Sequence, residues 1–108
     1  MAFCTTEFGI PAQKVKDNVA YTNAYYGGRT PAGTCLLYPN GEVDPWASQS
    51  ILKAPSAGIS TMMVDGASHH FWTHPTKATD QPSVIAARKA IRSYVHDMLA
   101  ADCEQAAQ

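Results

Sequence analysis

Apolar positions recur at helical spacing in two segments, one near each end of the chain. In residues 11–25, Val15, Val19 and Thr22 fall at this spacing, and two glycines then provide a stop signal. Residues 82–101 carry a longer apolar stripe. It consists of Val84, Ala87, Ile91, Val95 and Met98. The pattern predicts two helices, with Arg88 and the other charged residues of the second helix on its surface.

Two short apolar runs between these segments are typical of buried strands. Residues 35–38 (CLLY) are followed by turn chemistry at residues 39–41 (PNG), and residues 59–64 (ISTMMV) contain β-branched side chains. Pro45 can open a short helix over residues 46–53. Strand, short helix and strand form a βαβ unit, so we expect an α/β architecture with two parallel strands. Such a sheet is incomplete, because parallel sheets need several strands and cover on both faces.

Length, composition and charge narrow the possible functions. The 108 residues are 45% hydrophobic and 16% charged, which is ordinary for one small globular domain. A formal net charge of −1, without a cluster of lysine or arginine, argues against a nucleic-acid partner. No window approaches the roughly 20 apolar residues of a transmembrane helix. The first residues lack the basic start and apolar core of a signal peptide.

Asp44 and His69 each follow the end of a predicted strand. Parallel strands present their carboxyl ends at one edge of a sheet, so we expect both side chains at the same edge. Asp44 could then accept a hydrogen bond from Nδ1 of His69, leaving Nε2 as a general base. Acid before histidine, 25 residues apart, is also the chain order of α/β-hydrolases. The alternative role for Asp44 is to cap the short helix that Pro45 opens.

The chain lacks a recognisable nucleophile for this pair. No G-x-S-x-G motif occurs, and Ser56 and Ser68 are the nearest imitations. Ser68 directly precedes His69 and cannot easily face its Nε2, so we expect neither serine to be the nucleophile. The three cysteines include no CxxC pair, and an odd cysteine can have its partner outside the chain.

The histidines and aromatic residues near the pair have open alternatives. His70 and His74 have the i, i+4 spacing that binds zinc on a helix, but the following proline places them on a loop, so we expect no metal. Trp46, Phe71 and Trp72 can either pack in the core or form the apolar wall of a substrate pocket.

Six motifs, in order along the chain, resemble the C-terminal end of a serine carboxypeptidase family. The family includes lysosomal Pro-X carboxypeptidase, dipeptidyl peptidase II and thymus-specific serine protease. The motifs are Cys4 with Phe8-Gly9, TN-x-YYGG at 22–28, P-x-G at 31–33, NG-x-x-DPW at 40–46, G-x-x-HH at 66–70 and D-x-PSV-x-x-AR at 80–88. Each is weak alone, and their order and gaps together carry the resemblance.

The resemblance implies the C-terminal part of an α/β-hydrolase domain, whose serine nucleophile and remaining strands lie upstream. Asp44 matches the family's catalytic acid and His69 its catalytic base, and Trp46 is a candidate substrate-binding residue. No metal or cofactor is implied. Residues 1–28 would end a helical region leading into the sheet. Residues 34–104 would hold the last strands, the acid and histidine loops and the C-terminal helix.

The same resemblance implies an exopeptidase that cleaves next to proline, either a dipeptidyl peptidase or a Pro-X carboxypeptidase. Its expected partner is a peptide with proline near the cleaved bond, and neither nucleic acid nor membrane. Family members are secreted or lysosomal, and the full-length proteins can dimerise. Cys4 matches a family cysteine whose disulfide partner would lie upstream, whereas Cys35 and Cys103 match none. The alternative is a non-catalytic interaction module derived from such a peptidase.

The chain departs from the family pattern directly after the histidine pair. Family members usually have an acidic residue there, and this chain has Phe71-Trp72-Thr73 instead. The sequence therefore offers no acidic side chain directly after the pair to support the histidine loop.

Overall fold

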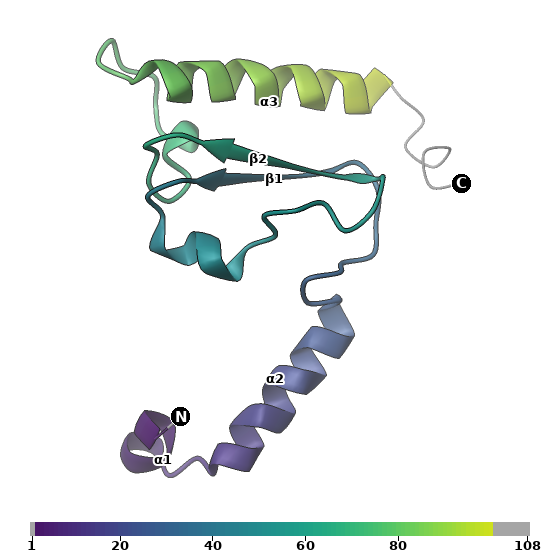
Figure 1. Ribbon diagram of the computed structural model, residues 1–108, viewed down its shortest axis with the longest axis vertical. Helices are drawn as coiled ribbons and strands as arrows, with labels where there is room; N and C mark the ends of the chain where they lie inside the picture. Colours follow the sequence, from purple (N-terminus) through teal and green to yellow (C-terminus); the bar gives the residue numbers. More distant parts are fainter. Residues whose placement is uncertain (1, 101–108) are drawn as a thin grey trace. The chain divides into compact units, whose positions relative to one another are not determined.

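The computed structural model of the protein describes residues 2–100, which form two compact units that divide after Ala32. The first unit contains helices α1 (Ala2–Phe8) and α2 (Ala12–Tyr26). The second contains strands β1 (Leu36–Gly41) and β2 (Ile59–Val64), the short 3-10 helices η1 (Pro45–Gln49) and η2 (Phe71–Thr73), and helix α3 (Pro82–Ala100) (Figure 1). None of the described helices has the length and apolar character needed to cross a membrane.

In the first unit, α2 confirms the first predicted helix to within one residue at each end. Pro11 precedes it as the N-cap, and Gly27 ends it with a φ of 85°, a left-handed conformation that favours glycine. A Cβ on Gly27 would also lie only 2.8 Å from the Cα of Pro31. Helix α1 is too short to show a helical period in the sequence, which is why the apolar pattern does not predict it.

The second unit is built on a two-stranded parallel sheet (Figure 1). β1 and β2 pair without a bulge from Leu36 opposite Ile59 to Gly41 opposite Val64. The bounds of β2 agree with the prediction at both ends. The sheet is thus the small parallel α/β arrangement that the sequence predicts, with two strands among the described residues.

β1 corrects the prediction that residues 39–41 end the strand, because Pro39 and Gly41 belong to it. Leu36 N donates to the carbonyl of Gly58, directly before β2, and Glu42 N donates to that of Val64 in β2. The even-numbered residues of β1 therefore face β2, and Pro39 faces away. The missing N–H of Pro39 therefore costs no hydrogen bond between the strands. The turn follows at residues 42–43.

The short helix between the strands also differs from the prediction over residues 46–53. η1 begins at Pro45 and ends at Gln49, with the tighter i to i+3 hydrogen bonds of a 3-10 helix. Asp44 is its N-cap, as the helix-cap alternative expected.

The core of the second unit lies between β2 and α3. Val64, Ala67, Val84 and Ala87 form a buried cluster, and Met62, Phe71 and Trp72 pack against it. Helix α3 begins at Pro82 as predicted. Its apolar stripe is buried only in the first half: Val84 is fully buried, whereas Val95 is 46% exposed. That the sheet is an incomplete part of a larger one stays a prediction.

Candidate active site

Asp44 and His69 meet at the carboxyl edge of the sheet, as their places after β1 and β2 predict. Oδ2 of Asp44 lies 2.7 Å from Nδ1 of His69. The Asp44 side chain is only 7% exposed, whereas that of His69 is 56% exposed. An ionised carboxylate can only accept, so Nδ1 carries the proton and Nε2 is the nitrogen available to another group.

The Asp44 carboxylate makes both of the contacts considered from the sequence, one to His69 and one to the start of η1. Its second oxygen, Oδ1, accepts a hydrogen bond of 2.8 Å from the backbone N–H of Trp46 and so caps η1. Partial burial raises the pKa of the Asp44 carboxyl, but the hydrogen bonds from His69 and Trp46 outweigh burial and leave the pKa below its ordinary value. Asp44 is therefore held as a carboxylate aimed at His69.

Backbone contacts join the acid loop to the histidine loop. Val43 N donates to the carbonyl of Ala67, and Gly66 N donates to Oε2 of Glu42 over 2.8 Å. Gly41 leaves room for this approach, since a Cβ there would lie 2.3 Å from the Ala67 carbonyl oxygen. Asp44 and His69 are 25 residues apart in sequence, and contacts between the residues just before each of them bring the two loops together.

A pocket of about 100 Å³ opens beside the pair. It is lined by Pro39, Asn40, Asp44, Trp46, Ser50, His69, His70 and Trp72. Trp46 is 64% exposed, so it is not part of the core. Phe71 and Trp72 pack against the core cluster, which is the other of the two roles considered for them. Among the described residues that line this pocket, Trp46 is the tryptophan with a largely open ring next to His69, and Trp72 lines the pocket from the core side.

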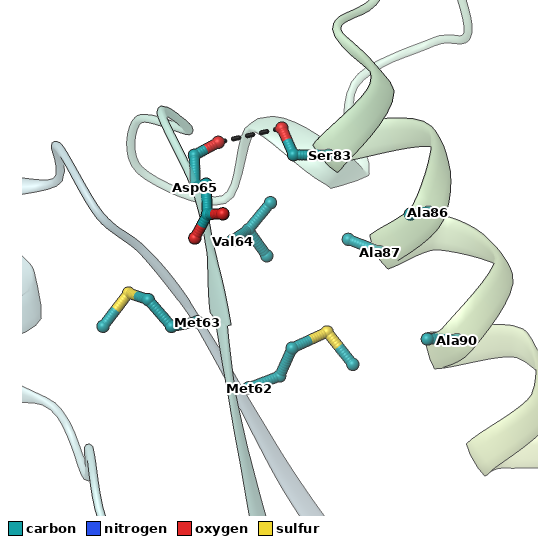
Figure 2. Close-up of a pocket in the computed structure, with 8 residues that line it drawn as sticks. All are labelled: Met62, Met63, Val64, Asp65, Ser83, Ala86, Ala87 and Ala90. Carbon is teal, nitrogen blue, oxygen red and sulfur yellow. Dashed lines mark hydrogen bonds between the residues drawn. The ribbon is translucent and has the colours of Figure 1, made fainter.

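A larger pocket, of about 280 Å³, lies between β2 and α3, away from the pair (Figure 2). Its lining is mostly apolar, with Met62 and Met63 on the strand side and three alanines of α3 opposite. At one end Ser83 Oγ donates to the backbone carbonyl of Asp65 over 2.8 Å. This pocket brings no acid–base pair together, so its size does not make it the candidate active site.

The rings of His69, His70 and His74 lie close together. The ring centroids of His69 and His70 are 4.4 Å apart, and those of His70 and His74 are 5.9 Å apart. Across the described residues, no group of three or more His, Cys, Asp or Glu side chains could hold a metal ion. The zinc alternative therefore lacks a ligand set in this part of the chain.

The prediction that Arg88 lies on the surface is wrong. Its side chain is only 11% exposed and forms an ion pair of 2.5 Å with Asp80, which is 3% exposed. The hydrogen bond from Arg88 lowers the pKa of the Asp80 carboxyl. The sequence contains a signal for this pair in D-x-PSV-x-x-AR, but the helical stripe alone does not reveal it.

Two of the three cysteines lie in the described part of the chain. Cys35 is disulfide-bonded, and Cys4 has a free thiol. Cys103 is outside the described residues. An upstream disulfide partner for Cys4 stays a prediction.

Comparison with known proteins gives one family and several relatives. The sequence model of the family described as serine carboxypeptidase S28 matches residues 1–91. Thymus-specific serine protease of Mus musculus is 33% identical over 99 residues, covering 92% of this chain and 19% of the relative. The Homo sapiens protein of the same name is 38% identical over 88 residues, covering 82% and 17%.

A more distant relative has a name that mentions proline. Lysosomal Pro-X carboxypeptidase of Homo sapiens is 27% identical over 75 residues, covering 68% of this chain and 15% of the relative. The chain therefore spans less than a fifth of the length of each of these three relatives. No solved structure matches the chain.

Proposed function

The chain belongs to the serine carboxypeptidase S28 family, and from that premise we propose that it supplies the acid and base of a Ser–Asp–His triad in a serine-type exopeptidase. The contact of 2.7 Å between Asp44 and His69 is the observation that carries the proposal. The nucleophilic serine would come from a part of the protein outside these 108 residues.

In the proposed mechanism His69 moves the protons and Asp44 orients it. His69 Nε2 removes the proton from the serine hydroxyl as the serine attacks the scissile carbonyl, and it then protonates the leaving amine. Asp44 holds the Nδ1–H tautomer and stabilises the imidazolium that forms between these steps. A water molecule then releases the acyl group by the same route, which restores the serine.

The proposed substrate is a peptide with proline near the cleaved bond. The name of lysosomal Pro-X carboxypeptidase supports this class of substrate. The pocket beside the pair supports it too, because its exposed Trp46 is a flat apolar surface that can contact a pyrrolidine ring. We also propose a secreted or lysosomal location for the whole protein, and the lysosomal name of one relative supports it.

A non-catalytic interaction module is the alternative function. Such a module would have no need to keep an acid aligned with a histidine nitrogen. The described geometry favours the peptidase, because the side chain of Asp44 is only 7% exposed and its two oxygens both accept hydrogen bonds.

Two measurements test the proposal. The purified 108-residue chain should give no turnover of an Xaa-Pro chromogenic substrate, because acyl transfer needs a nucleophile and an oxyanion hole. Turnover by this chain would contradict the missing nucleophile. The transcript upstream of the Met1 codon should contain an in-frame G-x-S-x-G, and its absence would overturn the triad.

The longer protein, translated from a transcript that includes the upstream G-x-S-x-G, permits a direct test. We expect it to react with a fluorophosphonate probe and to hydrolyse the substrate, and His69→Gln should lower kcat by about 10⁴-fold or more. His96→Gln, on the exposed C-terminal part of α3, is the matched control and should leave kcat unchanged. Full activity of the His69→Gln protein would disprove the role of His69.

A further inference from the structure

We infer that Arg88 is a positioning residue for His69: from α3, it fixes the loop that holds the histidine ring against Asp44. The inference rests on the proposed function only for the catalytic role of His69. The positioning itself is a property of this chain and can be measured without peptidase activity.

The guanidinium of Arg88 donates hydrogen bonds in three directions. Nε donates to the backbone carbonyl of Trp72 over 2.9 Å, and Nη2 donates to that of His74 over 3.0 Å. Nη1 donates to Oδ2 of Asp80. One side chain therefore holds two carbonyls of the segment that directly follows the histidine pair.

Asp80 closes the other end of the same loop. Its Oδ2 also accepts from the backbone N–H of Lys77 over 2.8 Å. The Arg88 and Asp80 side chains are almost completely covered, so solvent screens their attraction less than that of a surface pair. The ion pair and the contacts around it thus tie residues 72–80 back onto α3.

The held segment reaches His69 through Thr73 and His70. Thr73 Oγ1 donates to the backbone carbonyl of His70 over 2.8 Å and lies 3.2 Å from His70 Nδ1. The ring of His70 packs against that of His69. Each link is a direct contact, and together they run from α3 to the candidate base.

The backbone of His70 shows why the loop needs such support. His70 has a φ of 39°, in the left-handed region that non-glycine residues occupy at a cost of about 1–3 kcal/mol. A conformation of this kind persists only where surrounding contacts hold it. The carbonyl contacts of Arg88, at Trp72 and His74, lie within four residues of this strained position.

Lysine cannot reproduce this arrangement, which makes Arg88→Lys the informative variant. An ammonium group retains the charge opposite Asp80, but it lacks the planar fork that reaches two carbonyls at once. Arg92 lies one turn further along α3 and is exposed, so Arg92→Lys is the matched control.

The experiment is proton and nitrogen NMR of the ¹⁵N-labelled chain. The hydrogen-bonded Nδ1 proton of His69 should give a low-field signal that disappears in Asp44→Ala. In Arg88→Lys we expect this proton to exchange with solvent at least about tenfold faster, whereas Arg92→Lys should exchange at the wild-type rate. Circular dichroism and the methyl signals of Val84 report whether each variant remains folded.

A second variant keeps the test decisive if Arg88→Lys does not fold. Thr73→Val removes the hydroxyl link to His70 without touching Arg88, and we expect a smaller increase in exchange, of about threefold. A folded Arg88→Lys with wild-type exchange would overturn the inference, as would an unfolded Arg88→Lys together with wild-type exchange in Thr73→Val. The absence of the low-field proton in the wild-type chain would do the same.

Failure of this inference and failure of the proposed function give different results. If Arg88→Lys speeds exchange of the His69 Nδ1 proton while His69→Gln of the longer protein stays active, Arg88 positions His69 but the proposed triad is wrong. If His69→Gln is inactive and Arg88→Lys has no effect on the proton, the triad holds and the inference about Arg88 is wrong.

Discussion

The carbonyl oxygen of Ala67 lies over Gly41, so close that a Cβ on Gly41 would be 2.3 Å from it. Ala67 is two residues before His69, and Gly41 is three before Asp44. The same carbonyl accepts the N–H of Val43. The absence of a side chain at Gly41 is therefore a condition for the two loops to meet.

Gly41→Ala should separate the acid from the histidine. The added methyl group must push the backbone of residues 67–68 away, and we expect a loss of about 1–3 kcal/mol of stability. The low-field His69 proton should weaken in the NMR spectrum. Gly9→Ala is the control, because its cost arises from a φ of 62° alone, in the other unit. An unchanged His69 signal in Gly41→Ala would contradict the prediction.

Asp44→Asn should distinguish the two roles of this carboxylate. Asparagine is as good an N-cap as aspartate, so we expect η1 to stay capped and the chain to lose only the stabilisation that comes from the lowered pKa of the Asp44 carboxyl. It cannot stabilise an imidazolium, so kcat of the longer protein should fall by about 10⁴-fold. Urea unfolding and steady-state kinetics measure the two effects. An equal kcat in Asp44→Asn and wild type would leave only the capping role.

Stability should decrease in acid because of Asp44 and Asp80. Folding lowers the pKa of both carboxyls below the ordinary value of 3.8. A lowered folded pKa stabilises the native state above the unfolded pKa, and this contribution is lost as pH falls through the folded pKa. The urea midpoint of the chain should therefore decrease below about pH 4.

The variants Asp44→Asn and Asp80→Asn test this pH dependence one group at a time. Each should flatten the decrease of the urea midpoint in acid, since the substituted group no longer titrates. Asp97→Asn, on the exposed part of α3, is the control and should follow the wild-type curve. A wild-type acid slope in both Asp44→Asn and Asp80→Asn would contradict the assignment.

Trp46→Ala should affect substrate binding more than folding. Trp46 is 64% exposed, so its removal should change the free energy of unfolding by no more than about 0.5 kcal/mol. In the longer protein we expect KM for a proline-containing substrate to rise. Trp72→Ala is the contrasting variant, because Trp72 packs against the core and its loss should destabilise the chain. An unchanged KM in Trp46→Ala would remove this residue from the substrate pocket.

Sequence reasoning succeeds here where the signal is local. The bounds of β2, the start of α3 and the helix α2 all follow from apolar spacing, proline and glycine within one segment. The meeting of Asp44 and His69 was also predictable, because it needs only two parallel strands in one sheet. The catalytic roles of the two residues stay predictions.

By itself, then, the sequence determined α2, β2, the start of α3, the family and the residues that form the candidate acid–base pair. Only the tertiary structure decided that β1 continues through Pro39, that Trp46 is exposed and that Arg88 is buried against Asp80. Each of these depends on what the residue faces. Pro39 faces away from β2, Trp46 faces solvent, and Arg88 faces a loop that ends eight residues before it. Periodicity along one segment does not specify such neighbours, because they come from packing between segments.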